Sequence, residues 1–291
     1  MPYANSQLLV SPQQLAAELK SPDTIVLDCT STVVPAPGQT GFTVASGRQA
    51  FLNGHIPGAQ FVDIERDISI PAEGLLFTLP PADLFGAAMT RLGIGAGSRV
   101  ILYSTGQPGW AARVWLMLKA FGFDNAAVLN GGWQAWQKAG LAIAQGEPAV
   151  HPAPAEPFAW SLRSGVFVTT ADVEHRGAAA LVNALGPDAF RGEAAISYGR
   201  PGRIPGSVNV PTASLADPQT GLYRSQAELE AIFSGAGVRS KDPVIAYCGA
   251  GVAASNVVFA RFLTGAEAPS AVYDGSLLEW TKDGKREMET G

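Results

Sequence analysis

The chain has 291 residues and a formal net charge of −5; 47% of its residues are hydrophobic and 15% are charged. This length predicts two domains, and the negative charge argues against nucleic acid or an anionic membrane surface as the main partner, because both require clustered Lys and Arg. The first residues do not resemble a signal peptide, and no segment approaches about 18 uninterrupted apolar residues, so we expect a cytoplasmic protein.

In chain order, short apolar runs alternate with segments of helical pattern. The predicted strands are residues 24–29, 99–104 and 126–130, then 179–184, 243–248 and 270–274. The predicted helices are residues 11–20, 81–93, 169–178, 225–237 and 252–263, several of which begin at a Ser or Thr suited to N-capping. Such alternation predicts an α/β fold in which helices cover both faces of a parallel sheet.

The two halves of the chain repeat each other. The segment AVLNGGWQAW (127–136) returns as AVYDGSLLEW (271–280), and GHIPGAQFVDI (54–64) returns as GRIPGSVNVPT (202–212). RVILYS, ending at Ser104, returns as PVIAYC, ending at Cys248. Matched blocks in the same order indicate a duplication. Proline-rich residues 147–158 predict a linker between a first domain, 1–146, and a second, 159–291.

The chain contains two cysteines, Cys29 and Cys248, and three scattered histidines. Two cysteines are too few for a disulfide framework, and neither CxxC nor HExxH is present, so we expect free thiols and no metal. Cys29 ends a predicted strand without a glycine loop behind it, which is typical of a buried, inert thiol.

Cys248 differs because small residues follow it, CGAGVAA (248–254), between a strand and a helix. Ligands of parallel sheets bind at the carboxyl ends of the strands, where this turn lies. Small side chains allow the N–H groups of five residues to surround the sulfur and stabilise its thiolate. These residues are Gly249, Ala250, Gly251, Val252 and Ala253.

Two other interpretations of this loop are weaker. A phosphatase loop of the form C-x5-R would need an arginine where Ala254 stands. Gly249, Gly251 and Ala254 satisfy a dinucleotide fingerprint, with Asp274 ending the next strand, but this motif usually opens a nucleotide-binding fold rather than closing it.

The loop CGAGVAA resembles the active-site loop of the tandem rhodanese-type sulfurtransferases, and GHIPGA, RIPGSVNVP and VYDGSLLEW resemble other motifs of that family. The resemblance implies two tandem rhodanese-like domains, of which the first is inactive because Ser104 stands at the cysteine position. It also implies that Cys248 carries sulfur as a persulfide, without a cofactor.

The same resemblance implies which residues of this chain bind the substrate. Arg191 in DAFRG matches one substrate arginine of the family, and Arg200 is the nearest candidate for a second. The uncharged loop favours 3-mercaptopyruvate over thiosulfate. Ala250 and Ala253 replace the Ser and Thr of the mercaptopyruvate subgroup, and Asn183 and Leu185 replace the acidic and basic residues of its DAR motif.

The sequence therefore predicts a sulfurtransferase that moves sulfur from a small anionic donor, 3-mercaptopyruvate or thiosulfate, to cyanide or a thiol. A thioredoxin-like protein is one possible thiol acceptor. The alternative, motivated by the missing loop hydroxyls, is a sulfur-relay or regulatory module that binds a protein partner without turnover.

Overall fold

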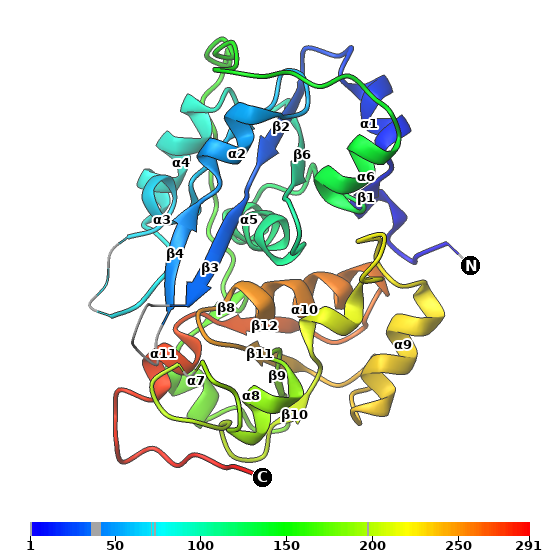
Figure 1. Cartoon of the computed structure of the whole chain (residues 1–291). Coiled ribbons are helices and arrows are strands. Elements are labelled where there is room, and N and C mark those ends of the chain that lie inside the picture. The colour runs from blue at the N-terminus through cyan, green and yellow to red at the C-terminus, as the bar shows by residue number, and fades with distance from the viewer. Residues whose placement is uncertain (1, 36–41, 71, 73, 197) are drawn as a thin grey trace.

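The computed structural model describes residues 2–35, 42–70, 72, 74–196 and 198–291. It contains two five-stranded parallel sheets, one in each half of the chain (Figure 1). The first, in the order β1-β7-β6-β2-β5, comprises β1 (Leu9–Val10), β2 (Thr24–Asp28), β5 (Gln60–Phe61), β6 (Arg99–Tyr103) and β7 (Ala126–Leu129). The second, in the order β8-β12-β11-β9-β10, comprises β8 (Phe167–Val168), β9 (Ala180–Asn183), β10 (Val208–Asn209), β11 (Val244–Tyr247) and β12 (Ser270–Tyr273).

Helices flank both sheets, and the predicted α/β fold is confirmed. The first half contains α1 (Pro12–Glu18), α2 (Arg48–Asn53), α3 (Ile64–Asp67), α4 (Ala82–Arg91), α5 (Gly109–Ala120) and α6 (Gly132–Lys138). The second contains α7 (Thr170–Glu174), α8 (Pro187–Arg191), α9 (Gln226–Gly235), α10 (Val252–Leu263) and α11 (Ser276–Trp280). Short 3-10 helices span Ser6–Leu8 and Thr212–Leu215. Capping boxes at Ser11, Thr169 and Ser225 fix three helix starts, because each side chain accepts a backbone N–H that the helix leaves free.

The duplication extends to individual hydrogen bonds. In the first half the Tyr103 hydroxyl accepts the N–H of Ile56 at 3.4 Å, and in the second the Tyr247 hydroxyl accepts the N–H of Ile204 at 3.0 Å. Both tyrosines end the central strand of their sheet, and both isoleucines belong to the repeated IPG motif. The repeated sequence blocks therefore hold the same loop against the same strand.

An antiparallel hairpin, β3 (Ser31–Pro35) and β4 (Phe42–Ser46), was not predicted from the sequence. It follows β2 in the first half, and no hairpin follows the equivalent strand β9 among the described residues of the second. In Figure 1 it extends from the first sheet down toward the second half of the molecule.

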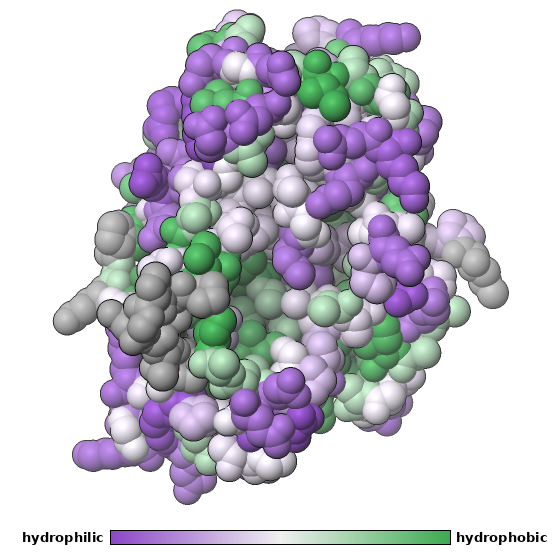
Figure 2. Space-filling view, in the orientation of Figure 1, coloured by the Kyte–Doolittle hydropathy of each residue, from purple (hydrophilic) through white to green (hydrophobic). Residues whose placement is uncertain are grey.

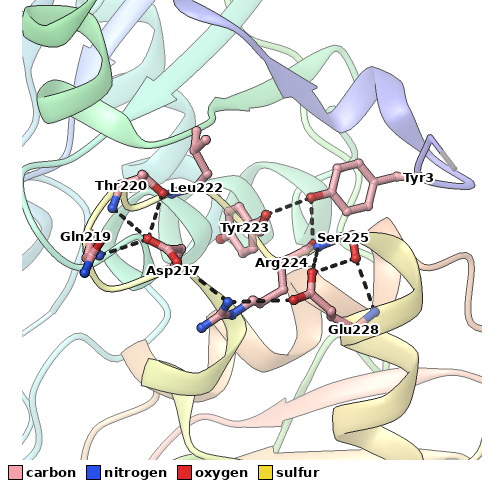
Figure 3. A network of polar contacts seen from close by, with 9 residues as sticks. All are labelled: Tyr3, Asp217, Gln219, Thr220, Leu222, Tyr223, Arg224, Ser225 and Glu228. Carbon is pink, nitrogen blue, oxygen red and sulfur yellow. Dashed lines mark hydrogen bonds and ion pairs between the residues drawn. The ribbon is translucent and has the colours of Figure 1, made fainter.

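The two halves share a continuous hydrophobic core. Helices α5 and α10 pack against each other, and the rings of Trp115 and Phe259 meet edge to face with 4.9 Å between their centroids. The N-terminal segment also crosses to the second half: the Tyr3 hydroxyl donates to the carbonyl oxygens of Tyr223 and Arg224, 3.1 and 2.8 Å away (Figure 3). The interface between the halves is therefore extensive and mainly apolar.

The segment that joins the two halves runs from residue 145 to 166 and contains no helix or strand. Its residues His151 and Pro154 lie against Gly93 and Gly95 of the first half. The domain limits given above, at residues 146 and 159, stay predictions. Within the described part of the chain, no helix has the length and apolar character needed to cross a membrane.

Candidate active site

Cys248 lies directly after β11, at the carboxyl edge of the second sheet, and is 3% exposed. The carbonyl oxygens of Cys248 and Gly249 each accept a 3.0 Å hydrogen bond, from the N–H groups of Leu277 and Leu278 in the first turn of α11. The block DGSLLEW therefore anchors the start of the cysteine loop, which explains why the two motifs recur together in the sequence.

Ser276 fixes the amide of the cysteine itself. Its hydroxyl accepts the Cys248 N–H at 3.2 Å and donates to the Tyr273 carbonyl at 2.8 Å. Ser276 is fully buried and has a φ of +50°, in the left-handed region that favours glycine. The equivalent residue of the first half is Gly132, with a φ of +55°. We did not identify Ser276 from the sequence, although the aligned segments NGGWQAW and DGSLLEW contain the signal.

The remaining amides of the loop are available to a ligand. None of the N–H groups from Gly249 to Ala253 is hydrogen-bonded to another described group. They precede or begin the twelve-residue helix α10, whose N-terminus favours negative charge. An anionic sulfur at Cys248 would therefore find several free donors close by.

Gly249 is required by a close approach rather than by its backbone angle. A Cβ atom there would lie 2.1 Å from Cε1 of Tyr198, so the tyrosine ring covers the loop directly. Burial, and secondarily the Cys248 charge, raises the pKa of Tyr198 to about 12, so its hydroxyl stays protonated at neutral pH. The Tyr198 ring also contacts Phe42 of the hairpin, with 4.9 Å between the ring centroids.

A cavity of about 490 Å³ opens in front of Cys248, between the two halves. Figure 2 shows it as a hollow with a largely hydrophobic floor near the middle of the molecule. The predicted loop residues Gly249, Ala250, Val252 and Ala253 line it together with Cys248, whereas Gly251 does not. The first half also lines the cavity, with Thr105 and Gln107 of the loop that begins with Ser104 and Trp110 of α5. The two duplicated loops therefore face one cavity.

Comparison with known proteins identifies the family. A family profile described as "Rhodanese-like domain" matches residues 11–139 and 175–283. A 3-mercaptopyruvate sulfurtransferase from Escherichia coli K12 is 34% identical over 279 residues, covering 93% of this chain and 94% of the relative. The chain belongs to the tandem-domain rhodanese-type sulfurtransferases.

Other members of this family agree over nearly the full length. The human 3-mercaptopyruvate sulfurtransferase is 34% identical, with 94% of this chain and 91% of the relative covered. The crystal structure of SseA from Escherichia coli, described as a 3-mercaptopyruvate sulfotransferase, superposes with a TM-score of 0.78 at 32% identity. That match covers 92% of this chain and 98% of the other. The predicted family and the predicted pair of rhodanese-like domains are confirmed.

The arginines carried over from the rhodanese family do not line the cavity. Arg191, at the end of α8, forms ion pairs with Asp188 and Glu193 at 2.6 and 2.8 Å. Arg200 donates to the carbonyl oxygens of Asp283 and Arg286 at 3.0 and 2.7 Å. The substrate-binding role of both residues stays a prediction.

Arg203 and His55, which stand in the repeated GRIPG and GHIPG motifs, both have partners within the protein. Arg203 is 8% exposed and forms a 2.6 Å ion pair with Glu289, and Nδ1 of His55 lies 2.9 Å from the Phe51 carbonyl oxygen. Cys29 is fully buried, and burial followed by the charge of Asp28 raises the pKa of its thiol well above the usual range. At the equivalent position of the first half, the Ser104 hydroxyl donates to the Gln107 carbonyl at 2.8 Å.

Proposed function

We propose that this protein transfers sulfane sulfur from 3-mercaptopyruvate to a thiol, through a persulfide on Cys248, in the cytoplasm. The observation that supports it is the position of Cys248: it lies at the interdomain cavity and begins a loop whose following amides are free to bind an anion. The identity of the donor is inferred from the relatives named 3-mercaptopyruvate sulfurtransferase.

In the first half-reaction the Cys248 thiolate attacks the sulfur atom of 3-mercaptopyruvate. A sulfur–sulfur bond forms, the carbon–sulfur bond breaks, and its electron pair leaves with the carbon as the enolate of pyruvate, which takes a proton from water. The outer sulfur of the persulfide ionises, and the free amides of residues 249–253 stabilise its charge. In the second half-reaction an acceptor thiolate attacks the outer sulfur, the persulfide bond breaks, and the Cys248 thiolate is regenerated.

Thiosulfate fits the site less well as a donor. It is a dianion, and no charged side chain lines the cavity among the described residues. A buried anion without a partner is costly, so the less charged donor is favoured. Loop amides alone must then stabilise the charge that develops during transfer.

The test compares steady-state sulfur transfer from 3-mercaptopyruvate and from thiosulfate, with Cys248→Ser as the control. We expect turnover with 3-mercaptopyruvate, a lower kcat/KM with thiosulfate, and no transfer by Cys248→Ser. Transfer retained by Cys248→Ser would overturn the proposal. A persulfide that forms stoichiometrically, without turnover with any small thiol, would support the relay module instead.

A further inference from the structure

The cavity in front of Cys248 is larger and more apolar than the proposed donor requires. Its volume of about 490 Å³ lies in the range of about 300–1,000 Å³ that holds drug-sized ligands. Thiosulfate and 3-mercaptopyruvate are much smaller than such ligands. The second substrate, the sulfur acceptor, is therefore the molecule whose size this cavity fits.

Aromatic side chains from both domains form much of the cavity wall. Phe42, Phe77 and Trp110 come from the first domain and Tyr198 from the second. Phe42 and Tyr198 meet edge to face, and Phe77 and Trp110 do the same with 5.3 Å between their centroids. Aromatic rings at such positions favour a flat, apolar ligand through edge and face contacts.

The polar groups of the cavity are neutral. They are hydroxyl and amide groups such as those of Thr105, Gln107 and Thr212, and the described lining contains no Asp, Glu, Lys, Arg or His. Leu185 contributes an apolar wall at a position where the family resemblance predicts a basic residue. A small anionic donor at Cys248 can use the loop amides, but an acceptor whose charged group lies away from those amides would lose its hydration without gaining an ion pair.

We propose that the sulfur acceptor is an uncharged, aromatic or otherwise apolar thiol that binds between the two domains. This inference rests on the proposed persulfide of Cys248. It also gives the first domain a function, because that domain lines the cavity with Val33, Phe42, Phe77 and Trp110. The first domain then selects the acceptor while the second performs the chemistry.

The acceptor step is tested separately from the donor step. The Cys248 persulfide is first formed with 3-mercaptopyruvate, the remaining donor is removed, and the added sulfur is verified by mass spectrometry. The probes are benzyl mercaptan and 4-(mercaptomethyl)benzoate, which differ by one carboxylate. The measured quantity is the second-order rate constant for removal of the outer sulfur. We expect it to be at least about tenfold larger for benzyl mercaptan than for the benzoate or glutathione. Equal rates, or a faster reaction with the charged thiols or with cyanide, would overturn this inference alone. Failure to form the persulfide would overturn the proposed function as well.

Two substitutions locate the effect in the cavity. Phe42→Ala, on the hairpin, should slow the reaction of benzyl mercaptan several-fold more than that of glutathione, which has no aromatic ring. Leu185→Arg should raise the rate with the benzoate relative to benzyl mercaptan, because it supplies a cation to the wall. Val150→Ala, at a residue 81% exposed and outside the cavity lining, is the control and should change neither rate. If Phe42→Ala slowed benzyl mercaptan and glutathione equally, selection by the cavity would be contradicted.

Discussion

At the scale of single residues, the cysteine loop depends on Ser276, which combines an unfavourable backbone angle with a favourable hydrogen bond. A non-glycine residue in the left-handed region costs about 1–2 kcal/mol. A buried N–H without a partner costs about 1–3 kcal/mol, so the bond from the Cys248 amide offsets the strain. In the first domain Ser104 stands at the cysteine position, and Gly132 stands at the position of Ser276.

Substitutions of Ser276 separate the two effects. Ser276→Ala keeps the backbone strain and loses the hydrogen bond, so it should lower the free energy of unfolding by about 1–3 kcal/mol. Ser276→Gly loses the same bond but relieves the strain, and its loss should be smaller. Denaturant titration measures both, and a Ser276→Ala protein as stable as the wild type would show that the bond contributes nothing.

Gly249 is the second residue whose type is fixed by packing. Gly249→Ala would bring a methyl group into the Tyr198 ring, and we expect a loss of about 1–3 kcal/mol in stability, together with slower persulfide formation. In the double variant Gly249→Ala/Tyr198→Ala the overlap is gone. Its stability should therefore exceed the value expected from adding the two single effects. Additive effects in this cycle would contradict the contact.

The arginines show what a residue pattern does not reveal, namely the partners that each guanidinium has in the fold. Arg191 was chosen for its place in DAFRG, but Asp188 and Glu193 lie two or three residues away and bind its guanidinium first. Ion pairs between residues so close in the chain can be predicted from the sequence. The two backbone carbonyls that hold Arg200 lie more than eighty residues later in the chain, and only the fold brings them there.

At the scale of elements, the predictions made from the sequence were most accurate for the buried strands and for α10. The helix predicted at 252–263 is observed as Val252–Leu263, and the run 24–29 contains the strand Thr24–Asp28. Apolar runs reveal these elements because both faces of a parallel sheet are buried. The hairpin of β3 and β4 was missed because it pairs locally, is largely exposed, and has no counterpart among the described residues of the second half.

The strands β2 and β9 end in Asp28 and Asn183, which gives a matched pair of elements with and without a buried carboxylate. Burial raises the pKa of Asp28 above its usual range, an effect that outweighs the opposing hydrogen bonds from Thr30. A carboxyl with a raised folded-state pKa contributes stability at low pH that is lost as the pH rises through that pKa.

Asp28→Asn gives the first domain the residue of the second. Compared with this variant, the wild type should lose stability as the pH rises from about 4 to 7, the range above the carboxyl pKa of the unfolded chain. Unfolding curves of the two proteins at several pH values measure the difference. A difference that is constant with pH would show that the carboxylate is not penalised by its burial.

At the scale of the whole molecule, Arg113 joins the first domain to the cysteine loop of the second. Its guanidinium is fully buried, forms a 2.6 Å ion pair with Asp274, and lies over the Phe167 ring. A Cβ atom added to Gly251 would be 3.0 Å from Nη1 of Arg113, so the arginine lies directly against the loop. The first domain therefore contacts the loop at Gly251, a residue that does not line the cavity.

Removing one member of a buried ion pair leaves the other charge uncompensated, so Arg113→Met should lower the free energy of unfolding by about 3–5 kcal/mol. Arg113→Met/Asp274→Asn removes both charges and should recover part of that loss. Because a single hydrophobic core spans the interface, we expect one cooperative transition for the wild type by calorimetry and by tryptophan fluorescence. If the double variant were no more stable than Arg113→Met, packing of the arginine rather than its charge would hold the domains together. In either case persulfide formation should slow in Arg113→Met, since the loop loses its support at Gly251.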